Sequence, residues 1–140
     1  MKRDRFDDYL RRFNAADSSA FLEYMHPRVL MTNGSMHLQG VEAVRAHYEL
    51  NIWPCFDETV VVERFVTDES TLAVRLRTTF VARSDAATVF GSVRRADRFQ
   101  YLGVVLYEIE DGRFTRIDVA YSEFLRIDSE GRATSLGMPH

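Results

Sequence analysis

Two tyrosines are the residues of this sequence best placed to do chemistry. Tyr9 and Tyr48 each fall on the apolar side of a helical pattern, where a core position usually carries Leu or Phe. A buried phenol needs a partner for its hydroxyl group, so the pair indicates a polar point inside an apolar cavity. A core tyrosine bonded to a backbone carbonyl is the competing interpretation of Tyr9.

His47 and Cys55 are the other reactive side chains near these helices. His47 lies at the edge of the apolar helical face, where it is either a general base or a surface histidine. Cys55 is the only cysteine, which excludes a disulfide or a Cys-based zinc site within one chain, and we interpret it as a small packing residue. The four histidines are scattered without metal-ligand spacing, and the chain has no glycine-rich phosphate loop. We therefore expect neither a metal nor a cofactor.

The chain that must position these residues has the size and composition of one globular domain. Its 140 residues are 46% hydrophobic and 28% charged. A net charge of −3 gives no reason to expect a nucleic-acid partner. No apolar run approaches the length of a membrane span and no signal peptide is recognisable, so we expect a cytoplasmic protein with no membrane contact. We assign residues 1–126 to a single domain and residues 127–140 to a loosely held tail.

Hydrophobic periodicity predicts helices first and strands afterwards. The helical period covers residues 4–14, 18–25 and 41–51. Residues 29–31 predict a short strand, and β-branched and aromatic residues then predict strands over 60–66, 71–82, 97–110 and 113–126, with a loop over 83–96. Asp111-Gly112 predicts a tight hairpin. This order predicts an α+β fold in which the three helices pack on one face of a curved antiparallel sheet.

Strand alternation predicts which side chains face the helices. The inward rows contain Thr78 and Phe80, then Tyr101 and Tyr107, then Val119 and Tyr121, whereas Asp118 points away. The outward row with Arg75, Arg77 and Thr79 suits a contact between two sheets, with Glu63 or Glu108 as acidic partners. We expect a homodimer through this convex face.

Four segments together resemble the nuclear transport factor 2-like superfamily, including its SnoaL-like and ketosteroid isomerase-like members. They are Tyr9-Leu-Arg-Arg-Phe-Asn-Ala-Ala-Asp17, Val29-Leu-Met-Thr-Asn33-Gly, Gly40-Val-Glu-Ala-Val-Arg-Ala-His-Tyr48 and Glu110-Asp-Gly-Arg-Phe-Thr-Arg-Ile117. The resemblance implies a cone-shaped α+β fold whose open end admits a small molecule between helices and sheet.

The resemblance carries over only part of the chemistry of these families. Tyr9 and Tyr48 match the tyrosines that form and support the oxyanion hole in ketosteroid isomerases. The general-base aspartate of that family falls on Asn33, and its protonated acid falls at or next to Val105, so the same isomerase chemistry is not expected. The acid of the SnoaL-type cyclases falls on Val119, one residue from Asp118. The dehydratase-like members use a histidine, for which His47 is the best placed.

Two function classes follow. The first is a cofactor-independent isomerase, cyclase or dehydratase acting on an apolar carbonyl compound, with Tyr9, Tyr48 and His47 as catalytic residues. The second is a non-catalytic module that binds a ligand or forms a dimer. Asn33 before Gly34 is more typical of a turn residue, and a helix cap and a packing residue explain Asn51 and Trp53 as well as ligand contacts do. The residues predicted to contact the small apolar ligand are Phe13, Asn33, Asn51, Trp53, Thr78, Phe80, Tyr101, Tyr107, Val119 and Tyr121.

Overall fold

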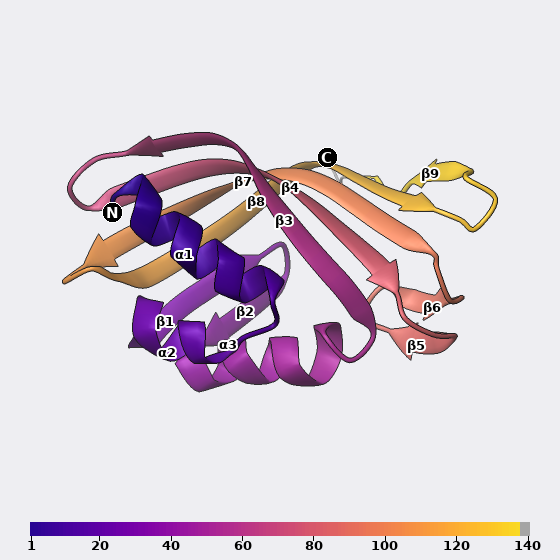
Figure 1. Cartoon of the computed structure of the whole chain (residues 1–140), viewed down its shortest axis with the longest axis horizontal. Helices are drawn as coiled ribbons and strands as arrows, with labels where there is room; N and C mark the ends of the chain where they lie inside the picture. The colour runs from indigo at the N-terminus through magenta and orange to yellow at the C-terminus, as the bar shows by residue number, and fades with distance from the viewer. Residues whose placement is uncertain (138–140) are drawn as a thin grey trace.

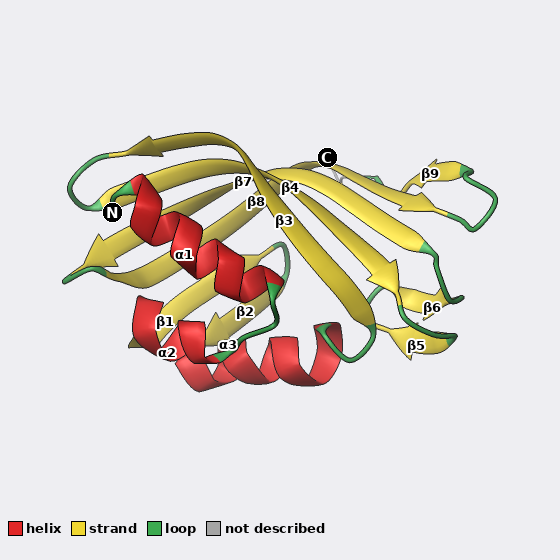
Figure 2. Cartoon of the chain, in the orientation of Figure 1, coloured by secondary structure: helices red, strands yellow, loops and turns green. Residues whose placement is uncertain are grey.

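The computed structural model describes residues 1–137 and consists of a curved sheet with helices packed on one face (Figure 1). The helices are α1 (Arg3–Asn14), α2 (Ser19–Tyr24) and α3 (Val41–His47), and α3 continues into a short π-helix, η1 (Tyr48–Ile52). No helix in this part of the chain is long and apolar enough to cross a membrane. Figure 2 shows all of the helices on the concave side, which leaves the other face of the long strands uncovered.

The main sheet has seven strands, and six of them follow the order β2-β1-β8-β7-β4-β3. Their bounds are β1 (Met25–Asn33), β2 (Met36–Gln39), β3 (Phe56–Thr67), β4 (Thr71–Ala82), β7 (Arg98–Glu110) and β8 (Arg113–Ile127). The seventh strand, β9 (Ala133–Ser135), pairs with the end of β8. A separate hairpin consists of β5 (Ala86–Thr88) and β6 (Gly91–Val93).

The α+β class is confirmed, but the helices do not all precede the strands, because β1 and β2 lie between α2 and α3 in the sequence. The prediction of a purely antiparallel sheet is also wrong in one place. Strand β1 runs parallel to β8, with Met31 opposite Ile117. Hairpin turns reveal only how neighbouring segments of the chain pair. The β1 and β8 segments are far apart in the sequence, and no turn residue reports their relative direction.

The core joins the helices to the concave face through aromatic side chains. On α1, Phe6, Tyr9 and Phe13 are buried, as the helical period predicts. Phe6 packs edge-on against Tyr107 with ring centroids 5.6 Å apart, and Tyr9 packs edge-on against Phe114 at 5.1 Å. This packing fixes α1 across the strands and holds the Tyr9 ring at a defined place on the concave face.

A β-bulge bends the sheet where β7 meets β8. The pairing shifts between Leu102, opposite Glu123, and Gly103, opposite Tyr121. A Cβ atom at position 103 would lie 2.8 Å from the carbonyl oxygen of Ala120, so the close approach of the strands requires glycine. The extra residue on β8 also changes the alternation, and both Tyr121 and Phe124 consequently face the concave side.

Other local features also differ from the sequence prediction, among them the strand β2, which was not predicted. The third helix changes to a π-helix after His47, and the N–H of Trp53 donates to the carbonyl oxygen of Tyr48 at 2.9 Å. The predicted loop over residues 83–96 contains the β5–β6 hairpin, whose strands are too short to show alternation. Phe90 at its tip packs on Phe99 with ring centroids 4.9 Å apart.

Candidate functional site

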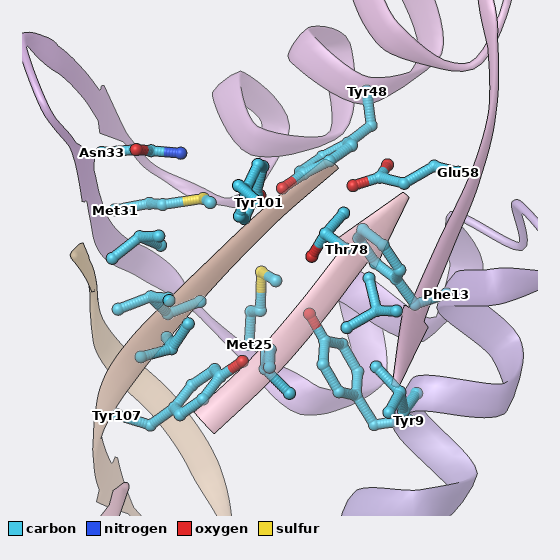
Figure 3. Close-up of a pocket in the computed structure, with 17 residues that line it drawn as sticks. Tyr9, Phe13, Met25, Met31, Asn33, Tyr48, Glu58, Thr78, Tyr101 and Tyr107 are labelled. Carbon is cyan, nitrogen blue, oxygen red and sulfur yellow. The ribbon is translucent and has the colours of Figure 1, made fainter. Parts of the chain in front are cut away.

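A narrow cavity lies between α1 and the concave face of the sheet, and we call it the inner chamber. It has a volume of about 50 Å³. Figure 3 shows that the hydroxyl groups of Tyr9, Tyr48, Tyr107 and Thr78 and the carboxyl group of Glu58 point toward its centre. The remaining wall is almost wholly apolar and includes Phe13, Met25, Met31, Leu76, Val105, Ile117 and Val119.

A wider cavity adjoins the inner chamber on the side of the β5–β6 hairpin, and we call it the outer chamber. Its volume is about 260 Å³. The residues that belong only to its wall include Met36, His47, Phe80, Phe90, Tyr121 and Phe124. Both chambers share Asn33, Tyr48, Glu58 and Tyr101, so these four side chains stand at the boundary between them.

Glu58 is the most unusual residue at this boundary. The residue is 8% exposed, and its Oε2 atom has no hydrogen-bond partner among residues 1–137. Burial raises the pKa of Glu58 from 4.5 to about 8, and a hydrogen bond from the Trp53 side chain opposes that shift. A carboxyl group in this state can take up or release a proton close to neutral pH.

Glu58 is not among the site residues predicted from the sequence, because the predicted strand begins only at residue 60. In the structure β3 begins at Phe56, and Phe56, Glu58 and Val60 alternate inward while Asp57 and Thr59 are exposed. Glu58 pairs with Phe80 on β4. Extending the alternation of β3 backward from Val60 would have placed an acid in the apolar row.

The phenols around Glu58 keep their protons at neutral pH. Burial is the main cause that raises the pKa of Tyr9, Tyr48, Tyr101 and Tyr107 above the ordinary value of 10, and the nearby Glu58 adds to the shift for the first three. Each phenol is therefore available as a hydrogen-bond donor. The inner chamber combines one titratable acid with several fixed donors in an apolar wall.

The three residues predicted to be catalytic lie at different depths. Tyr9 belongs to the wall of the inner chamber, Tyr48 to the boundary and His47 to the outer chamber. No direct hydrogen bond joins the hydroxyls of Tyr9 and Tyr48 in residues 1–137. Burial lowers the pKa of His47, whose ring packs edge-on against Tyr48. His47 is consequently neutral at pH 7.

Eight of the ten residues predicted to contact a ligand lie on the chamber walls. The inner chamber has Phe13, Thr78, Tyr107 and Val119, the outer chamber has Phe80 and Tyr121, and the boundary has Asn33 and Tyr101. Asn51 is exposed and lies outside both walls, so the geometry gives no support for a ligand contact there. Trp53 is buried behind the wall and acts on the site through Glu58.

Asp118 lies on the outer face of the sheet, as the alternation predicts. Its carboxylate accepts a hydrogen bond from Thr32 Oγ1 at 2.7 Å and forms an ion pair with Arg116, also at 2.7 Å. These partners lower its pKa, with Arg116 the larger cause. Val105, at the position of the second acid of ketosteroid isomerases, is apolar and lines the inner chamber. Glu58 supplies a carboxyl group from a different strand.

Within the described residues, no three His, Cys, Asp or Glu side chains come together as potential metal ligands. His140, the terminal histidine, lies outside residues 1–137.

The model of the SnoaL-like domain family matches residues 6–117 of the chain. No curated protein matches it in sequence. Among solved structures, a SnoaL-like polyketide cyclase from Agrobacterium tumefaciens is 19% identical, with a TM-score of 0.68 over 87% of this chain and 93% of that one. An LEH-like epoxide hydrolase from M. tuberculosis is 12% identical, with a TM-score of 0.65 over 85% and 80%. An NTF2-like protein of unknown function from Cytophaga hutchinsonii is 13% identical, with a TM-score of 0.62 over 86% and 88%. These likenesses show the fold.

Proposed function

The chain belongs to the SnoaL-like domain family, and from this premise we propose that it is a cofactor-independent enzyme that moves a proton on an apolar carbonyl compound. The observation that carries the proposal is Glu58, a buried carboxyl with an unpartnered oxygen among protonated phenols. Proton transfer from carbon needs a base of suitable pKa and a donor for the oxygen that becomes negative. Both kinds of group face one space here.

In the proposed reaction, ionised Glu58 removes a proton from the carbon next to the carbonyl group. The C–H electron pair moves into an enolate, whose oxygen accepts hydrogen bonds from Tyr9 and Tyr48. The protonated Glu58 returns the proton to another carbon in an isomerisation, or to a departing hydroxyl group in a dehydration. In a cyclisation, the enolate carbon attacks a second carbonyl carbon, and Glu58 protonates the alkoxide that forms.

A test that does not require the natural substrate is exchange of α-hydrogens in deuterium oxide. The probe is 2-tetralone, an apolar bicyclic ketone, and NMR follows its exchange at pD 8 with and without protein. We expect the wild-type protein to accelerate exchange and the Glu58→Gln variant to lose roughly a hundredfold or more of that acceleration, as expected for removal of a general base. Glu63→Gln, the same change outside the chambers on the same strand, is the matched control. Equal exchange by Glu58→Gln and wild type would exclude Glu58 as the base.

A non-catalytic binding module is the second candidate, and the small volume of the inner chamber favours it. Tyr9 lines only this chamber of about 50 Å³, which Phe13 and Tyr107 help to fill. A ligand held entirely in the outer chamber would not reach the Tyr9 hydroxyl. The module is the better description if 2-tetralone binds while the wild-type protein does not accelerate its exchange.

We also propose that the protein is a homodimer through the uncovered face of the sheet. This face carries exposed Val61, Val66, Val104 and Leu106 on β3 and β7. Glu63 already pairs with Arg77 at 2.7 Å and with Arg75 at 3.4 Å, so these charges can be covered without losing their partners. A second copy would present the same apolar strip and the same ion pairs.

A further inference from the structure

The outer chamber has an aromatic wall that the proposed proton transfer does not require. Five rings follow one another around it, and the centroid distances are 5.1 Å from Phe80 to Phe90, 5.3 Å from Phe90 to Phe124, 5.7 Å from Phe124 to Tyr121 and 5.7 Å from Tyr121 to Tyr101. A sixth ring, Tyr48, stands at the boundary with the inner chamber.

The charge on the chamber walls has one sign only. Among the described residues, neither wall contains a lysine or an arginine, and Glu58 is the one acid. Burial lowers the pKa of His47, which leaves that ring neutral at pH 7. An anionic ligand would find no positive partner, and it would meet both Glu58 and the negative faces of the rings.

We propose that the outer chamber binds an apolar organic cation, such as a substituted ammonium ion, with its positive centre against Glu58 and the surrounding rings. The unpartnered Oε2 atom of the buried Glu58 lies at the inner end of the aromatic wall and supplies the opposite charge. Aromatic faces attract a desolvated cation, and carboxylate and rings together recognise it better than either alone. The chamber exceeds the cavity of about 150 Å³ that is known to hold benzene, so the cation can carry a ring.

Binding of a cation must be coupled to the ionisation of Glu58, whose pKa burial raises to about 8. The other ionisable groups that face the chambers are Tyr9 from α1, His47 and Tyr48 from α3 and η1, Tyr101 and Tyr107 from β7, and Tyr121 from β8. Burial keeps Tyr9, Tyr48, Tyr101 and Tyr107 protonated and His47 neutral between pH 7 and pH 9. The ionised fraction of Glu58 rises about tenfold over this range, and affinity for a cation should rise with it.

Two probes of the same shape isolate the charge. They are 4-(hydroxymethyl)phenyl-trimethylammonium and 4-tert-butylbenzyl alcohol. The first has a positively charged nitrogen where the second has a neutral carbon atom bearing the same three methyl groups. Calorimetric titration of the wild-type protein should give an ammonium Kd that tightens roughly tenfold from pH 7 to pH 9, with the alcohol unchanged. Glu58→Gln should weaken the ammonium at pH 9 by roughly tenfold or more and leave the alcohol within about threefold.

Phe90→Leu tests the rings separately from the acid, because it keeps an apolar side chain at the tip of the hairpin. It should weaken the ammonium by about threefold or more relative to the alcohol. The inference is wrong if the two probes respond equally to Glu58→Gln, or if the ammonium does not bind at millimolar concentration at pH 9. The cation proposal rests on the proposed site but not on its catalytic activity. A protein without cation selectivity could still accelerate the exchange of 2-tetralone, and a protein without that exchange activity could still prefer the cation, so the two experiments distinguish the two proposals.

Discussion

Ionising a carboxyl group in an apolar wall costs free energy. For Glu58 this cost exists only in the folded state, because the unfolded chain exposes the group to water. Its folded pKa of about 8 lies above the ordinary value of 4.5, so the folded protein binds more protons than the unfolded chain between these two values. Stability must then fall as pH rises through this window. The same energetic cost makes the group reactive, because a base that water and ion pairs do not stabilise accepts a proton readily.

We predict that the free energy of unfolding of the wild-type protein decreases by up to roughly 1.4 kcal/mol per pH unit between about pH 5 and pH 8 because of Glu58. Glu58→Gln has no proton to lose there and should remove most of that slope. Urea unfolding at a series of pH values measures both proteins. Parallel pH profiles for the two would mean that Glu58 has an ordinary pKa.

Tyr9→Phe tests the donor that the sequence identified first. The substitution keeps the ring that packs on Phe114 and removes only the hydroxyl group in the inner chamber. We expect it to lower the exchange of 2-tetralone by roughly tenfold to a thousandfold, as for loss of one oxyanion donor. Circular dichroism and the unfolding midpoint check that the fold is retained. Unchanged exchange would assign Tyr9 to the core and leave Tyr48 as the donor.

At the scale of elements, the bulge between β7 and β8 decides which side chains reach the outer chamber. Strict alternation on β8 places Ile117, Val119 and Tyr121 inward, and the structure agrees up to that point. Strict alternation does not predict that Phe124 faces the outer chamber, because the inserted residue reverses the alternation. The π-helix that begins at Tyr48 could not be predicted either, since hydrophobic periodicity does not distinguish a π-helix from an α-helix over one turn.

Gly103→Ala should disturb the bulge directly. The added methyl group would lie 2.8 Å from the Ala120 carbonyl oxygen, a backbone atom that cannot turn away. We expect a loss of about 1–3 kcal/mol in unfolding free energy, typical of overpacking, together with weaker binding in the outer chamber. Leu50→Ala, at an exposed apolar residue of η1 outside both chambers and away from the sheet, is the control and should change stability by less than about 1 kcal/mol. A fully stable Gly103→Ala protein would show that the strands can separate at little cost.

At the scale of the whole molecule, the sequence could predict the fold far better than the site. Periodicity, the Asp111-Gly112 turn and the order of the elements suffice for helices on a curved sheet. The chambers depend on β1 lying parallel to β8 and on a hairpin of short strands that contributes Val89 and Phe90 to the outer wall, and both are long-range results of packing. The position of Glu58 also required the true start of β3, which lies four residues before the predicted one.

The uncovered face of the sheet leads to the last prediction, which concerns assembly. Val104 pairs with Arg75 on β4 and Ala120 on β8, so it stands near the middle of the exposed apolar strip. Val104→Glu would place a charge there, and burying an unpaired charge against a second copy is strongly unfavourable. We expect analytical ultracentrifugation to show a dimer for the wild-type protein and a monomer for Val104→Glu. Leu50→Glu makes a similar change at an exposed apolar residue of η1, away from the sheet, and should stay dimeric. A monomeric wild-type protein would contradict the proposed dimer. Dimers in all three proteins would show that the interface lies on another face.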